Sequence, residues 1–80
     1  MPTFVLAHAH HETECRVAYS AWRGFDSPLR GSDTAASCAA GDHRMFWTVE
    51  ADSSEAARAQ LPPYLAERTH VSQVTKVAIR

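Results

Sequence analysis

The sequence is poor in the features that mark several large classes of protein. Two of its 80 residues are cysteine, and no apolar run approaches the roughly 20 residues that span a bilayer. We therefore expect no association with a membrane. The amino-terminal segment lacks the basic region of a signal peptide and its apolar run is short, so we expect a cytoplasmic protein. In a reducing compartment, two cysteines are more often free thiols or metal ligands than a disulfide.

The sequence also lacks an excess of charge of either sign. Eight basic and nine acidic residues are interspersed, with a formal net charge of −1, so there is no basic patch and we expect no nucleic-acid partner. There is no Gly-rich phosphate loop, no Cys-x-x-Cys pair and no His-Glu-x-x-His motif. No motif therefore names a reaction, and no catalytic residue is predicted.

The length limits what the chain can bury. Eighty residues make one domain, spanning 1–80, and 45% of them are hydrophobic, which is ordinary for a globular protein. A chain of this size buries about 60% of the surface that its unfolded form exposes. Its core is small, so a bound metal or a partner subunit would contribute usefully to stability.

Local patterns predict six elements. Alternating apolar residues, Gly-containing turns, a capping sequence and a Pro-Pro pair supply the signals. We expect strands at 3–10, 34–40, 44–51 and 70–79, the last with a bulge near Gln73, and helices at 13–23 and from 52 to Leu61. The order β-α-β-β-α-β predicts a ferredoxin-like α+β fold, with a four-stranded antiparallel sheet and two helices on one face.

We further expect the first and third strands to lie side by side at the centre of the sheet and to run parallel. The helices would then cover Met45 and Trp47. Phe4, Leu6 and Phe46 would point to the bare face of the sheet. Large apolar side chains on a bare face mark an interaction surface, so the sequence predicts a two-fold homodimer through that face.

Potential metal ligands are concentrated at residues 8–15, which hold three of the five histidines and one of the two cysteines. His8 and His10 are two apart at the end of a strand, so they share a face and one metal ion can take both. We expect further ligands from nearby donors. The candidate metal ligands are His8, His10, His11, Cys15, Glu50 and His70.

The three more distant candidates depend on the predicted topology. Glu50 lies near the carboxyl end of the third strand, and a parallel arrangement would bring it to the same end as His8. His70 begins the antiparallel fourth strand and reaches that end too. Cys15 lies in the first turn of a helix, where the helix N-terminus lowers a thiol pKa.

Each donor also has an ordinary structural interpretation. Cys15 fits the apolar face of its helix, because a buried cysteine behaves as a small hydrophobic side chain. Glu50 is equally well explained as a solvated charge. We interpret Cys38 as a core residue of the second strand and His43 as an exposed residue of the turn that follows.

The two ends of the sequence carry a family resemblance. Met1-Pro2 is followed by a strand, and the chain closes on His-Val-Ser-Gln-Val-Thr-Lys-Val at residues 70–77. In these features and in length it resembles the small ferredoxin-like, nickel-binding proteins of actinobacteria. The resemblance implies a homodimer and a divalent metal held by histidines.

Three functions fit these patterns. The first is a metal-binding protein for storage, buffering or delivery, with nickel, zinc or copper as the ion, since imidazole suits all three. The alternative is a dimeric α+β-barrel enzyme whose His/Glu pocket, with or without metal, performs oxidation, isomerisation or hydrolysis. The third is an interaction domain with incidental histidines.

Overall fold

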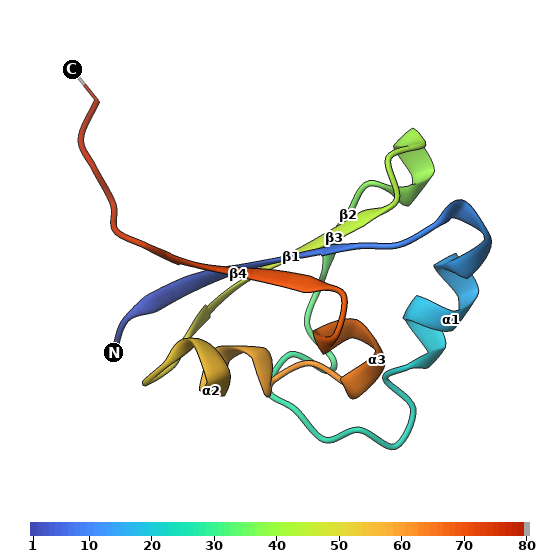
Figure 1. Ribbon diagram of the computed structural model, residues 1–80, viewed down its shortest axis with the longest axis horizontal. Coiled ribbons are helices and arrows are strands. Elements are labelled where there is room, and N and C mark those ends of the chain that lie inside the picture. The colour runs from blue at the N-terminus through green and yellow to red at the C-terminus, as the bar shows by residue number, and fades with distance from the viewer. Residues whose placement is uncertain (80) are drawn as a thin grey trace.

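The protein forms an α+β fold around one four-stranded antiparallel sheet (Figure 1). The computed structural model describes residues 1–79. The strands are β1 (Thr3–Ala9), β2 (Ala35–Ala36), β3 (Arg44–Glu50) and β4 (Thr69–Val74), and their order across the sheet is β2-β3-β1-β4. The predicted α+β class and antiparallel sheet are therefore confirmed.

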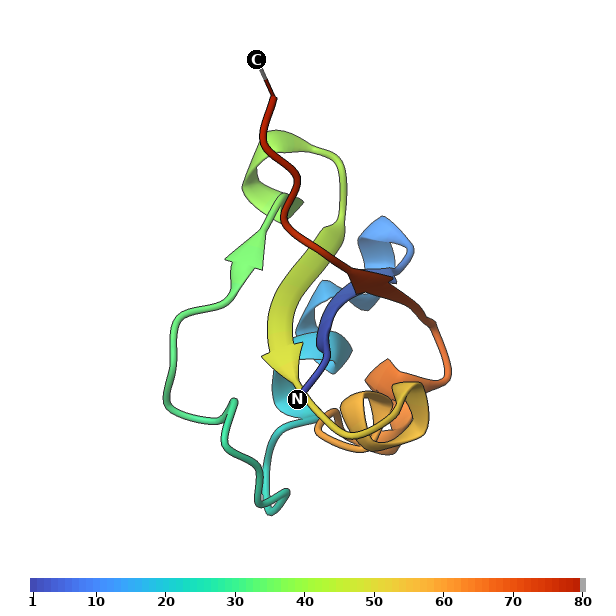
Figure 2. The same ribbon diagram turned by 90° about the vertical axis from the view of Figure 1, so that its left-hand side faces the viewer.

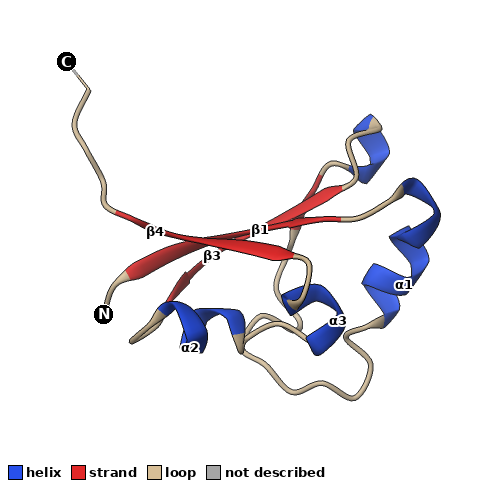
Figure 3. Cartoon of the chain, viewed as in Figure 1, coloured by secondary structure: helices blue, strands red, loops and turns tan. Residues whose placement is uncertain are grey.

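The helices are short, and the three α-helices lie on one side of the sheet (Figure 3). The α-helices are α1 (Cys15–Ser20), α2 (Ser54–Arg58) and α3 (Pro63–Ala66), and all three pack beneath the sheet. Two 3-10 turns, η1 (Glu12–Glu14) and η2 (Cys38–Ala40), complete the helical elements of the described residues. In the described part of the chain, no helix approaches the length needed to cross a bilayer.

Local sequence explains the boundaries of helices α2 and α3. Ser53 is the N-cap of α2, and its side chain accepts a hydrogen bond from the Ala56 N–H at 3.1 Å. Pro62 and Pro63 then separate α2 from α3, because proline cannot continue a helix but suits the first position of the next one. The helix predicted to reach Leu61 ends at Arg58, and α3 follows it as a separate helix after the Pro-Pro pair.

The central strands run antiparallel, and the expected parallel arrangement is wrong. Thr3 pairs with Glu50, and His8 pairs with Met45. The α1 crossover leaves β1 and β2 pointing the same way, and the tight turn after η2 then reverses the chain into β3. Glu50 consequently lies at the end of the sheet opposite to His8.

The antiparallel register also corrects the expected faces of β1. Phe4 pairs with Val49, and Leu6 pairs with Trp47. Directly paired residues share a face, so Phe4 and Leu6 point under the helices and are buried. The buried core comprises Phe4, Leu6, Ala18, Met45, Trp47, Val49, Ala51, Ala57, Leu61 and Leu65. Phe46 does lie on the open face, as predicted, and is 36% exposed.

The outer strands are shorter than predicted. Within residues 34–40, the pairing with β3 is limited to Ala35 and Ala36, and the chain then coils into η2. β4 pairs with β1 in unbroken register up to Val74, without the expected bulge in its paired residues. Residues 75–79 lead away from the body of the protein (Figure 2). They pass the beginning of β1, where that strand can offer no further pairing.

Candidate metal centre

Four donor atoms converge at one end of the sheet. His10, Cys15, Cys38 and His43 each offer one potential ligand atom, and these atoms all lie within 4.8 Å of one another. His10 follows β1, Cys15 opens α1, Cys38 opens η2, and His43 precedes β3. The cluster therefore joins the end of the central strand to the crossover helix and to the β2–β3 connection.

The distances match the edges of a small coordination polyhedron. His10 Nε2 lies 3.3 Å from Cys15 Sγ and 3.3 Å from Cys38 Sγ, and Cys15 Sγ lies 3.2 Å from His43 Nδ1. A tetrahedral zinc ion, with Zn–S and Zn–N bonds of about 2.3 and 2.05 Å, separates sulfur from nitrogen by about 3.6 Å. An outward shift of a few tenths of an ångström therefore fits one ion between the four donors.

Backbone contacts hold the two halves of the cluster together. The His10 N–H donates to the His43 carbonyl at 3.1 Å, which ties the end of β1 to the turn. Within the turn, the Ser37 hydroxyl donates to Asp42 Oδ2 at 3.0 Å, and the Ser37 N–H donates to the Arg44 carbonyl at 2.8 Å. The positions of Cys38 and His43 thus follow from a closed, hydrogen-bonded turn.

His43 itself has an unusual backbone conformation. Its φ is +56°, and within residues 1–79 it is the one non-glycine residue with a positive φ. A side chain with a Cβ atom disfavours this left-handed region by about 1–2 kcal/mol. Such strain is concentrated at functional sites, where the local structure has to aim a side chain. Here it aims Nδ1 of His43 at Cys15.

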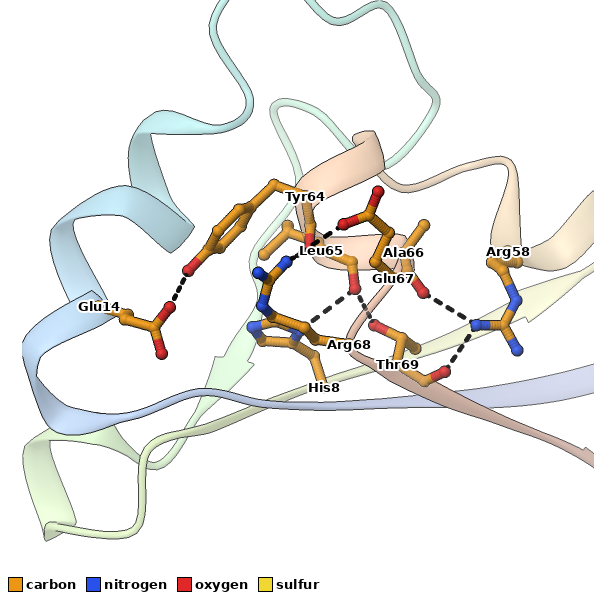
Figure 4. A network of polar contacts seen from close by, with 9 residues as sticks. All are labelled: His8, Glu14, Arg58, Tyr64, Leu65, Ala66, Glu67, Arg68 and Thr69. Carbon is orange, nitrogen blue, oxygen red and sulfur yellow. Dashed lines mark hydrogen bonds and ion pairs between the residues drawn. The ribbon is translucent and has the colours of Figure 1, made fainter.

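Cys15 is positioned by a helix cap. The Nδ1 atom of His11 accepts from the Thr13 N–H at 3.2 Å, and Glu14 Oε1 accepts from the His11 N–H at 3.1 Å, which completes a capping box. The other carboxylate oxygen of Glu14 accepts from the Tyr64 hydroxyl at 2.6 Å (Figure 4). That hydrogen bond holds the pKa of Glu14 below its usual value. It also anchors the start of α1 to α3.

Burial favours the neutral form of two of the four ligands, Cys15 and His10. Burial raises the pKa of the Cys15 thiol, and the hydrogen bond with Cys38 raises it further, contrary to the lowered pKa expected for a helix N-terminus. Burial and the neighbouring His43 lower the pKa of His10. The interaction with Cys38 raises the pKa of Tyr19 to about 12. A bound cation offsets the cost of forming thiolates here, and its binding releases protons.

A search of protein families, curated proteins and solved structures finds no match for this chain. The convergence of four donor atoms at one end of the sheet supports a metal centre without a relative for comparison.

Two of the predicted ligands, His10 and Cys15, lie in the cluster, and the other four lie elsewhere. His8 is buried in the core beside the cluster. His11 is exposed and caps η1. Glu50 lies at the far end of the sheet, because it pairs with the first residue of β1. His70 is exposed on the open face, since it pairs with Ala7 and not with His8.

Cys38 and His43 are the two members of the cluster that the sequence interpretation assigned other roles. Both are half-buried, neither in the core nor fully exposed. A signal for them exists in the spacing. His10 and Cys15 are separated by four residues, and so are Cys38 and His43. Two ligand pairs with short internal spacing, far apart in the chain, are typical of zinc sites.

Proposed function

We propose that this protein binds one divalent transition metal ion, preferably zinc, through His10 Nε2, Cys15 Sγ, Cys38 Sγ and His43 Nδ1. The observation that carries the proposal is the mutual approach of these four atoms to within 4.8 Å. Two thiolates and two imidazoles in a compact tetrahedral arrangement form a ligand set typical of zinc. Copper(I) is the closest competitor on ligand softness.

The closed ligand set supports binding over catalysis. Structural zinc sites use four protein ligands, whereas catalytic sites keep one position open for water or substrate. An ion held here would fasten the end of β1 and the start of α1 to the η2 turn. All four residues are half-buried, so the ion also stays close to solvent, which suits exchange in storage, buffering or delivery.

The enzyme hypothesis has less support. It requires a pocket on the bare sheet face that contains Phe4, Leu6 and the His/Glu group. Phe4 and Leu6 are buried under the helices, and Glu50 lies at the far end of the sheet from His8. The observed faces therefore do not assemble that pocket.

The family resemblance gives a competing prediction about the ion. It implies nickel, a homodimer and a ferredoxin-like fold. The strand order β2-β3-β1-β4 agrees with that fold, whereas the helices are shorter than the sequence predicts. Nickel(II) favours square-planar or tetragonal sites, whereas the S₂N₂ donor set suits tetrahedral zinc. Measuring the affinity of the protein for nickel and for zinc under the same conditions distinguishes these two predictions.

The direct test is a metal titration of the protein purified without a histidine tag. Elemental analysis should find one zinc ion per chain. Cobalt(II) added to the metal-free protein should give the intense absorption of tetrahedral cobalt–thiolate coordination, and zinc should displace it. Structural zinc sites bind with about 10–16 kcal/mol, so we expect a Kd of about 50 nM or tighter.

Variants assign the signal to the cluster. Cys15→Ser and Cys38→Ser should each weaken the cobalt–thiolate band and lower the affinity. His70→Ala is the matched control, because His70 is an exposed histidine outside the cluster. The proposal fails if zinc, nickel and copper show no saturable binding below about 10 μM. It also fails if His70→Ala weakens binding as much as the cysteine variants do.

A further inference from the structure

Two buried nitrogens on neighbouring imidazole rings lack a hydrogen-bond partner in the described part of the chain. They are Nε2 of His8 and Nδ1 of His10. His8 has an exposed fraction of 0%, and the two ring centroids are 5.2 Å apart with an interplanar angle of 38°. Buried polar atoms are nearly always paired, so two neighbouring exceptions require an explanation.

The contacts of each ring fix which nitrogen carries hydrogen. His8 Nδ1 lies 3.3 Å from the Leu65 carbonyl, which can only accept, so Nδ1 holds the proton and Nε2 is left as an acceptor. His10 directs Nε2 at the two sulfur atoms. A histidine that binds metal through Nε2 carries its hydrogen on Nδ1. The two unpartnered nitrogens are therefore a donor and an acceptor.

We propose that His8 is a positioning residue for the metal centre, whose Nε2 accepts a hydrogen bond from His10 Nδ1–H, directly or through one water molecule. This inference rests on the proposed metal binding at His10. Metal-ligating histidines generally donate their second ring N–H to an acceptor, which fixes the ring orientation and raises the basicity of the ligand. A centroid separation of 5.2 Å allows that contact after a small adjustment.

The acceptor is itself held by the core. The Leu65 carbonyl accepts from His8 and, at 2.6 Å, from the Thr69 hydroxyl (Figure 4). Leu65 is in α3, directly after Tyr64, which holds Glu14 at the start of α1. Two successive residues of α3 thus support the two segments that carry His10 and Cys15. This arrangement gives α3 a role in shaping the metal centre without contributing a ligand.

The test compares two core variants that disturb the same carbonyl. His8→Leu removes the proposed acceptor and fills its place with an apolar side chain of similar size. Thr69→Val removes the other hydrogen bond to Leu65 without touching His10. We expect His8→Leu to lower zinc affinity about 10- to 100-fold, measured by chelator competition, and Thr69→Val to change it less than about twofold. His8→Leu should also change the cobalt spectrum, which reports ligand geometry.

A second measurement covers the case in which His8→Leu does not fold. In the zinc-loaded wild-type protein, nitrogen-15 NMR of the imidazoles should show hydrogen on Nδ1 of both His8 and His10. Hydrogen on Nε2 of His8 would overturn the inference, and so would equal affinities for His8→Leu and Thr69→Val. In either case the wild-type protein still binds zinc. Failure of the proposed function would instead show as no zinc binding by the wild-type protein.

Discussion

His43 shows how much one residue contributes to the cluster and what it costs the fold. Its φ of +56° is unfavourable for any residue with a Cβ atom, while glycine adopts it freely. We therefore expect metal-free His43→Gly to be more stable than metal-free His43→Ala by about 1 kcal/mol. Urea denaturation with a chelator present measures this difference.

The same two variants test the role of the side chain. Both remove one of four ligands, so both should bind zinc at least about tenfold more weakly than the wild-type protein. Equal stability of the two variants would contradict the strain argument. Wild-type affinity in both would exclude His43 from the ligand set.

His8 should make the stability of the metal-free protein depend on pH. Burial lowers its pKa below 6.5, and burial lowers the pKa of His10 in the same way. The unfolded chain therefore binds protons that the folded chain excludes. Stability should be fully present above about pH 6.5 and should fall as the pH drops from there towards the lowered pKa values.

Urea midpoints between pH 7.5 and 5.5, measured with a chelator, check this expectation. The wild-type midpoint should fall with pH, and His8→Leu should show a shallower fall because one of the two titrating groups is gone. A midpoint that stays constant or rises on acidification would contradict it.

The site residues show which parts of the metal centre the sequence could reveal. His10 and Cys15 are close in sequence, so their shared location follows from local reasoning. Cys38 and His43 are distant from them, and each has a plausible local role of its own. A straight strand over 34–40 would carry Cys38 away from the cluster. The observed strand stops at Ala36, and the following η2 turn brings Cys38 back.

At the scale of the elements, local sequence signals predict the presence of a strand or helix better than the direction in which neighbouring strands run. Alternation, the Ser53 cap and the Pro-Pro pair lie within a few residues and correctly indicate strands and helices. Whether β1 and β3 run parallel depends on the crossover between them, which no short pattern encodes. The wrong strand direction led to the prediction that Glu50 lies at the same end of the sheet as His8. The wrong assignment of faces on β1 led to the prediction that Phe4 and Leu6 lie outside the core.

Arg58 joins α2 to the last residue of α3 and the first residue of β4. Its Nη1 atom donates to the carbonyls of Ala66 and Thr69, both at 2.8 Å (Figure 4). Hydrogen bonds from a charged donor contribute about 1.5–3 kcal/mol, and their loss leaves two carbonyls unpaired. We expect Arg58→Met to reduce the free energy of unfolding by about 2 kcal/mol, measured by urea denaturation.

Arg30→Met is the control for this change. Arg30 is exposed, and its Nη1 donates to the Phe25 carbonyl at 3.4 Å. Its replacement should change stability by less than about 0.5 kcal/mol. A similar loss in both variants would mean that arginine charge, and not the bridge, accounts for the effect.

At the scale of the whole molecule, the open face of the sheet carries exposed apolar side chains. Phe46 is 36% exposed there, and Val5 and Ala7 lie on the same face. Residues 75–79 add further apolar surface, since Val77 is 74% and Ile79 is 91% exposed. Exposed apolar side chains of this kind mark an interaction site, and a core this small gains from covering them.

We therefore expect a homodimer in which both copies use the open face and the 75–79 segment in a two-fold arrangement. Light scattering at tens of micromolar should give twice the chain mass, with and without zinc. Val77→Ser combined with Ile79→Ser should shift the mass towards that of one chain, because the burial of each large apolar side chain contributes about 1.5–3 kcal/mol. Val17→Ser, which changes an exposed apolar residue on α1, should leave the dimer intact. A single-chain mass for the wild-type protein would show that the open face stays in water.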